Sequence, residues 1–179
     1  MTYYSQLGQD VLVDRIMQQK VNGTFLDVGA SYFDNMNNSY FFEKERLWRG
    51  VAVEIDDRYN EGWKNRPHTF YINEDALKVD YVKVLADNNM PDVIDYLSVD
   101  LEPPEVTYQA FCKIMETKYI FNVVTFEVDY YRDTSTRDPA RQMMEDKGYY
   151  LVAEIKQGDA HIDDVYVHES HYERIKHIL

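Results

Sequence analysis

Residues 24–43, TFLDVGASYFDNMNNSYFFE, run from a short apolar segment through one glycine and an asparagine cluster into a segment of helical spacing. The first five residues, TFLDV, are mostly apolar or β-branched, which predicts a buried strand. Gly29 follows at once, and glycine permits the tight turn that leads from such a strand into a helix. The stretch therefore predicts a strand, a turn and a helix, and the turn is either a ligand cradle or only a connection.

Four further segments resemble this strand, and segments of helical spacing lie between them. We predict strands at residues 24–28, 50–55, 68–72, 94–99 and 120–128. We predict helices at residues 38–47, 79–88 and 105–118, and another helix in the stretch that ends at residue 19. Strands that alternate with helices indicate a parallel sheet with right-handed crossovers and helices on both faces.

A different pattern closes the chain. A helix is predicted within RDPARQMMEDKG (137–148), and two strand-like segments, YYLVAEIK (149–156) and DDVYVHES (163–170), follow it on either side of QGDAHI (157–162). These segments predict an antiparallel hairpin. The predicted fold class is α/β: a Rossmann-like doubly wound sheet, mostly parallel, with a C-terminal antiparallel hairpin, as in class I methyltransferases and unlike dinucleotide dehydrogenases.

Length and composition limit the partners that we expect. A chain of 179 residues with 45% apolar residues fits one globular domain over residues 1–179. A formal charge of −13 predicts repulsion from nucleic acid and from anionic membranes, so we expect neither as a partner. Because there is no membrane-length apolar run, no leader pattern and only one cysteine, Cys112, we expect a soluble, cytoplasmic protein.

The first predicted strand ends where open α/β sheets bind their ligands. The chain lacks the G-x-G-x-x-G pattern there, which argues against a loop that grips a pyrophosphate. Asp27 either orders the turn or faces a cationic group, and Gly29 lets the backbone approach a ligand. Asn37, Asn38 and Ser39 either cap the next helix or contact a ligand.

Acidic residues also end the next two predicted strands. Glu54 lies 25 residues after Gly29, near the spacing at which an acid accepts hydrogen bonds from ribose hydroxyls. The alternative is that Glu54 only caps the segment that follows it. Asp75 and Ala76 follow the third predicted strand, where a carboxylate could meet an adenine amino group.

Five motifs, taken in order, resemble the FkbM-type methyltransferase family. They are SQLGQD (Ser5 to Asp10), DVGA (Asp27 to Ala30), Asn38-Ser39, WRGVAVE (Trp48 to Glu54) and DYLSVDLE (Asp95 to Glu102). The resemblance implies a Rossmann-like fold, S-adenosylmethionine as the methyl donor, and an enzyme that methylates a hydroxyl of a small molecule such as a saccharide. The family usually continues the last motif with glycine and another acid, whereas this chain has Pro103 and Pro104. Because prolines stiffen a loop and lack amide donors, the alternative is a non-catalytic S-adenosylmethionine or nucleoside-binding module of the same fold.

The motifs and the resemblance together give the predicted site. Donor-binding residues are Gln6, Gln9, Asp27, Gly29, Ala30, Asn38, Glu54, Asp75, Ala76 and Asp100. Predicted catalytic residues are Asp100, Glu102 and Glu127. Asp129 is a further candidate for a general base, and so is His161, which falls in the predicted hairpin loop. Asp100 and Glu102 point to opposite faces if the strand stays regular. Asp100, Glu102 and Glu127 could hold a hard cation, but a hydrated acidic rim explains them as well, so we predict no metal.

Overall fold

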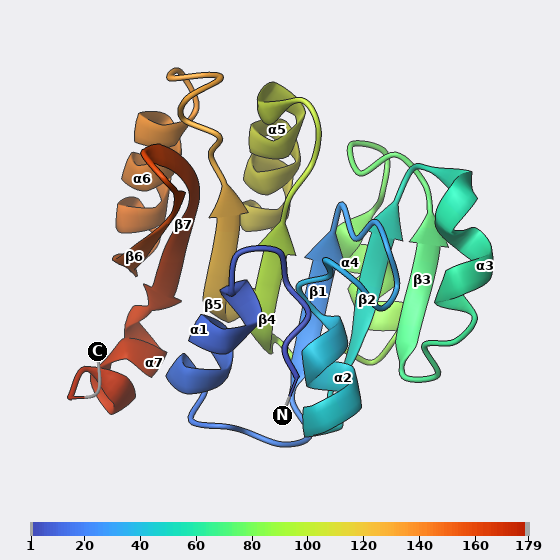
Figure 1. Cartoon of the computed structure of the whole chain (residues 1–179). Helices are drawn as coiled ribbons and strands as arrows, with labels where there is room; N and C mark the ends of the chain where they lie inside the picture. Colours follow the sequence, from blue (N-terminus) through green and yellow to red (C-terminus); the bar gives the residue numbers. More distant parts are fainter. Residues whose placement is uncertain (1, 178–179) are drawn as a thin grey trace.

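The computed structural model describes residues 2–177 and centres on a seven-stranded sheet of order β3-β2-β1-β4-β5-β7-β6 (Figure 1). The strands are β1 (Thr24–Val28), β2 (Arg49–Glu54), β3 (Thr69–Asn73), β4 (Val93–Val99), β5 (Ile120–Glu127), β6 (Tyr149–Gln157) and β7 (Ala160–His168). The first five strands pair in parallel, and β7 pairs antiparallel with both β5 and β6. The sheet thus joins a parallel α/β half to the predicted closing hairpin.

Helices cover both faces of this sheet (Figure 1). They are α1 (Gln9–Ile16), α2 (Tyr40–Arg46), α3 (Asn60–Trp63), α4 (Tyr81–Asp87), α5 (Pro104–Met115), α6 (Arg137–Asp146) and α7 (Glu169–Ile175), with a 3-10 turn at Asp57–Tyr59. In residues 2–177, no helix has the length and apolar character that a membrane crossing requires. The predicted cytoplasmic location stays a prediction.

The core lies in two layers, one on each face of the sheet. On one face, Leu26 of β1 belongs to a buried cluster with Phe111 of α5 and Met144 of α6. On the other face, Phe25 belongs to a cluster with Phe42 of α2. Every residue of β1 is buried, because side chains alternate between the two faces and both faces are covered.

The five predicted parallel strands are confirmed to within one residue at each end. The helix boundaries are less accurate. The first helix ends at Ile16, before the predicted residue 19, because Gln18 and Gln19 take left-handed φ values of 51° and 57°. Helix α5 also ends early, at Met115, and the short helices α3 and α7 were not predicted.

The hairpin is tighter than its sequence suggested. The predicted six-residue connection, residues 157–162, is wrong, because only Gly158 and Asp159 lie between β6 and β7. Gly158 has a φ of 62°, which glycine adopts without the cost that a side chain would bring. His161 therefore lies on β7 and not in a loop.

Candidate functional site

A cavity of about 450 Å³ lies at the carboxyl ends of β1, β2 and β4, and we call it the strand-end cavity. It is lined by Gln6, Asp27, Gly29, Ala30, Ser31, Met36, Asn38, Glu54, Ile55, Asp56, Arg58, Tyr59, Asp100, Leu101 and Glu102. This is the edge of a parallel sheet at which ligands bind in open α/β folds. Eight of the predicted site residues line it: Gln6, Asp27, Gly29, Ala30, Asn38, Glu54, Asp100 and Glu102.

Gly29 forms the floor of the turn after β1. Its φ of 83° lies in the left-handed region, and a Cβ built there would lie 1.7 Å from the carbonyl oxygen of Asp100. The amides of Gly29 and Ala30 donate to the carbonyl of Val53, at 2.9 Å and 3.1 Å. The glycine thus allows the ends of three neighbouring strands to meet at the strand-end cavity.

Asp27 is almost fully buried beneath this turn, with 2% of its surface exposed. Asn37 donates its side-chain amide to Asp27 at 3.3 Å, and the hydroxyl of Ser39 donates to the side-chain oxygen of Asn37 at 3.0 Å. Burial nevertheless raises the pKa of Asp27 to about 6. Asp27 both orders the loop and lines the cavity, so the two predicted roles are compatible.

Asn37 and Asn38 have different hydrogen-bond partners and different roles. Asn37 caps the helix region, because its side-chain oxygen accepts from the amides of Ser39 at 3.0 Å and Tyr40 at 2.7 Å. Ser39 makes no side-chain cap bond at the start of α2. Asn38 donates to the hydroxyl of Ser98 at 2.9 Å and lines the cavity. The capping role thus falls to Asn37, which leaves the carbonyl oxygen of Asn38 available to a ligand.

Glu54 ends β2 with its carboxylate held in place by two backbone amides. Ser31 donates to one oxygen at 2.9 Å, and Asp56 donates to the other at 2.8 Å. The bond to Asp56 is the predicted capping role, and the bond to Ser31 ties the loop after β1 to the end of β2. Each carboxylate oxygen can accept a further hydrogen bond, so Glu54 can still bind a vicinal diol.

Asp100 and Glu102 both line the cavity. Opposite faces were expected only if the strand stayed regular, and this condition is not met, because β4 ends at Val99 and residues 100–103 turn instead of continuing the strand. Glu102 pairs with Arg132 at 2.5 Å, and Arg132 also pairs with Asp129 at 2.9 Å. Asp100 forms no ion pair with a basic residue in the part of the chain that the structure describes.

Four predicted site residues do not line the strand-end cavity: Gln9, Asp75, Ala76 and Glu127. Gln9 points inward from α1 and donates to Asp163 at 2.9 Å. Asp75 accepts from the amide of Leu77 at 2.9 Å within its own turn, and Ala76 is packed in the core. The donor-binding roles of Gln9, Asp75 and Ala76 and the catalytic role of Glu127 stay predictions that the cavity lining does not support.

Arg66 holds the loop between β1 and α2 and was not predicted. It is 3% exposed and forms a buried ion pair with Glu43. It also donates to the carbonyl of Phe33 at 2.8 Å and to the hydroxyl of Ser39 at 3.2 Å. These partners lie 23 to 33 residues away in sequence, so no local pattern could indicate the contact.

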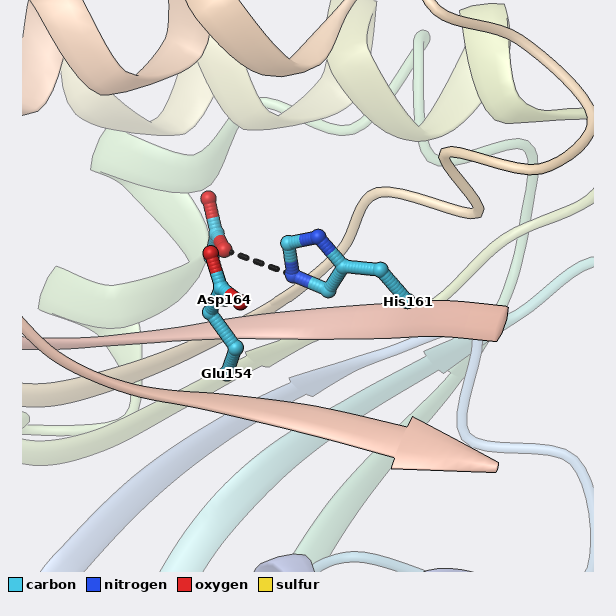
Figure 2. Close-up of side chains that lie close together, drawn as sticks. All are labelled: Glu154, His161 and Asp164. Atoms are coloured by element: carbon cyan, nitrogen blue, oxygen red, sulfur yellow. Dashed lines mark ion pairs between the residues drawn. The ribbon is translucent and has the colours of Figure 1, made fainter. Parts of the chain in front are cut away.

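A cluster of titratable groups, Glu154, His161 and Asp164, lies outside the cavity, on the hairpin. Figure 2 shows these side chains projecting from β6 and β7 to the same side. The Nε2 atom of His161 lies 2.9 Å from a carboxylate oxygen of Asp164. The three groups lie within 4.8 Å of one another, which suits a cation. Arg141 already supplies that charge, because it donates to Asp164 at 2.6 Å and 2.7 Å and to Glu154 at 2.7 Å. The cluster is therefore an ionic network that ties α6 to the hairpin, and His161 lies away from the cavity.

Further acidic side chains lie beyond the strand-end cavity, on the neighbouring strands of the sheet. The strand register places Asp27 of β1 beside Ser98, two residues before Asp100, and it pairs Glu127 of β5 directly with Asp163 of β7. Burial and the charge of Asp100 raise the pKa of Asp163 to about 7. This accumulation of buried carboxyl groups makes the folded state take up protons more readily than the unfolded chain.

Stability should therefore fall as the pH rises. Because the pKa of Asp163 is raised from 3.8 to about 7, the folded chain binds its proton more tightly, and that advantage is lost between these two values. We expect Asp163→Asn to gain stability relative to the wild type, by up to about 4 kcal/mol, between about pH 4 and about pH 8. Urea unfolding at several pH values measures this difference. Asp159→Asn, in the hairpin turn, is the control, and parallel curves for D163N and the wild type would contradict the expectation.

No model of a known protein family matches the sequence, and no curated protein matches it either. Solved structures match it over most of its length. The METTL16 MTase domain has a TM-score of 0.65 at 11% identity, with 92% of this chain and 67% of that chain covered. Fibrillarin from Aeropyrum pernix, in complex with natively bound S-adenosyl-L-methionine, has a TM-score of 0.57 at 14% identity over 91% of this chain and 74% of that chain. An rRNA methylase from Streptococcus thermophilus has a TM-score of 0.55 at 12% identity over 88% of this chain and 93% of that chain.

These likenesses show the fold. The chain has the Rossmann-like α/β fold of class I methyltransferases, and the predicted fold class is confirmed. The prediction that nucleic acid is excluded as a partner is wrong, because an rRNA methylase shares this fold. The physical reason is that net charge sums over the whole chain, whereas binding depends on the field at the contact surface.

Proposed function

We propose that this chain is an S-adenosylmethionine-dependent methyltransferase of the FkbM type that methylates a hydroxyl oxygen of a small molecule such as a saccharide. The observation that carries the proposal is the strand-end cavity, whose volume of about 450 Å³ suits a small ligand. Five carboxylates and the Gly29 turn line it, and Arg58 is the one basic residue among the lining residues. An acidic cavity of this kind favours a cationic ligand.

S-adenosylmethionine fits this lining by its chemistry. It carries a sulfonium, an ammonium and a ribose diol, and it carries no phosphate. The carboxylates attract its positive groups and would repel the pyrophosphate of a dinucleotide. Glu54 would accept from the ribose hydroxyls, and Asp27 would face the ammonium group. When bound, the donor supplies an electrophilic methyl group.

Two further residues that line the cavity would serve the acceptor. Methyl transfer requires the acceptor oxygen to lie about 3 Å from the methyl carbon, and a base must remove its proton. Asp100 and Glu102 are carboxylates that line the cavity after the end of β4, and we assign this task to them. They would hold the acceptor hydroxyl and take its proton.

The Pro103-Pro104 sequence does not argue against catalysis. Pro104 is the first residue of α5, where the amide has no partner within the helix, so the missing donors cost no hydrogen bond. Thr107 fixes the preceding turn, because its hydroxyl bonds both the amide of Leu101 at 3.2 Å and its carbonyl at 2.6 Å. The missing amide donors therefore do not favour the binding-module alternative.

Titration calorimetry and a transfer assay test the proposal. We expect binding of S-adenosylmethionine and of its demethylated product, no binding of NAD, and transfer of labelled methyl groups to hydroxylated small molecules. No heat with either sulfur compound would overturn the proposal. Binding without transfer to any acceptor would favour the binding module, and transfer to RNA alone would replace the small-molecule acceptor.

Glu54 provides a residue-level test of donor binding. We expect Glu54→Ala to weaken S-adenosylmethionine binding about 10- to 100-fold, because hydrogen bonds to a charged group contribute about 1.5–3 kcal/mol. Calorimetry measures the affinity, and a thermal unfolding curve checks that the variant is folded. Glu61→Ala, an exposed acid on the nearby helix α3, is the control. Equal affinities for E54A and the wild type would remove the ribose role.

A further inference from the structure

Asp100 and Glu127 lie next to each other at the carboxyl ends of two adjacent strands, β4 and β5. The last pair in the parallel register of β4 and β5 is Val99 with Phe126, so the next residue of each strand is a carboxylic acid. This register brings the two carboxyl groups within reach of each other, and a hydrogen bond between them requires that one of them carries a proton. Asp100 lines the strand-end cavity, whereas Glu127 does not. The pair therefore has one member at the site and one member behind it.

The surroundings decide which member keeps the proton. The charged groups that face Glu127 are Asp100, which follows β4, Asp163 of β7, and Asp129 of the segment after β5, and all of them are acids. The nearby cation, Arg132, pairs with Asp129 and Glu102 instead. One carboxyl oxygen of Glu127 is buried and accepts no hydrogen bond from any described residue. Burial and the charge of Asp100 raise the pKa of Glu127 well above its usual range.

We infer that Glu127 is a positioning residue: it keeps its proton, donates it in a hydrogen bond to Asp100, and so holds Asp100 as the base that takes the proton of the acceptor hydroxyl. This inference rests on the proposed methyl transfer. Two acids that share one proton behave as a pair, because both cannot ionise in the same buried volume. Glu127 thereby keeps one oxygen of Asp100 fixed, and the other oxygen stays open to the cavity.

The reaction balances with these groups. The acceptor O–H bond breaks, and its proton goes to the Asp100 carboxylate. The oxygen forms a bond to the methyl carbon, the carbon–sulfur bond breaks, and its electron pair stays on sulfur. The products are the methyl ether, the neutral thioether and a protonated Asp100, so no further reactant is required. Glu127 keeps its own proton throughout.

Two substitutions separate positioning from packing. Glu127→Gln keeps a donor toward Asp100 and cannot ionise, so we expect its turnover to stay within about threefold of the wild type. Glu127→Leu has a similar volume and no donor, so we expect kcat to fall about 100-fold with little change in KM, within the range for a general base. Without the donor, the pKa of Asp100 rises, so the acidic limb of the kcat profile moves to higher pH in E127L and stays in place in E127Q. Equal pH profiles in all three proteins would overturn the inference.

A measurement without substrate keeps this test independent of the proposed activity. In protein labelled with ¹³C-glutamate, the infrared spectrum at about pH 8 should contain the band of one protonated glutamic acid, and E127Q should lack it. Absence of this band in the wild type would overturn the inference even if methyl transfer occurs. Presence of the band without transfer to any acceptor would support the proton-sharing pair and count against the proposed function.

Discussion

We expect Gly29→Ala to have the largest effect of any single substitution at the strand-end cavity. A left-handed residue with a side chain costs about 1–2 kcal/mol, and the φ of Gly29 is 83°. The added Cβ would also lie 1.7 Å from the carbonyl oxygen of Asp100, which is backbone and cannot rotate away. Overpacking of this kind costs about 1–3 kcal/mol more, so we expect a loss of about 2–5 kcal/mol in the free energy of unfolding.

Urea unfolding measures this loss, and Gly158→Ala is the matched control. Gly158 also has a left-handed φ, 62°, but nothing lies within 4 Å of the Cβ that alanine would add. Its cost should therefore be the conformational part alone, about 1 kcal/mol. A G29A protein as stable as G158A would show that the ends of β1 and β4 are not in close contact. We also expect G29A to lose at least about tenfold in S-adenosylmethionine affinity, because the end of β4 must move away from the cavity.

The second large effect is expected at Arg66. Its ion pair with Glu43 is buried, with side-chain exposures of 1% and 4%. Removing one partner of a buried pair leaves an uncompensated charge, so we expect Arg66→Met to cost about 3–5 kcal/mol. The loop from Phe33 to Ser39 also loses its anchor, so donor affinity should fall in any protein that remains folded.

The double variant Arg66→Met with Glu43→Gln tests the cause. Because it removes both charges, it should recover about 2 kcal/mol relative to R66M alone. The control is Lys64→Met, two residues away, whose partner Glu61 is 84% exposed, and we expect its stability to match the wild type within error. If R66M is as stable as K64M, the buried pair does not hold this loop.

Much of the fold could be predicted because its signals are local. Runs of β-branched and aromatic residues located the parallel strands to within one residue, since such runs suit strands that are buried on both faces. Helix ends were harder, because Gln18 and Gln19 take left-handed φ values that their residue type does not favour. The hairpin connection was overestimated, because the turn at Gly158 needs only two residues.

Side-chain direction explains what was missed at the site. Gln9 lies within the SQLGQD motif and Asp75 follows the third predicted strand, yet Gln9 bonds Asp163 on β7, and Asp75 bonds its own turn. Glu127 lies on β5, outside the cavity lining, although it neighbours Asp100. The direction of each of these groups depends on partners in other strands and turns, which the sequence does not order in space.

The sequence by itself determined the alternation of strands and helices, the glycine turn after β1, and the acids Asp27, Glu54 and Asp100 at strand ends, because these depend on a few neighbouring residues. The tertiary structure alone decided that Arg66 anchors the loop before α2. It alone also decided that Glu127 pairs with Asp100 at the side of the strand-end cavity. Both contacts join residues at least 23 positions apart, and only the order and register of the strands bring such residues within bonding distance.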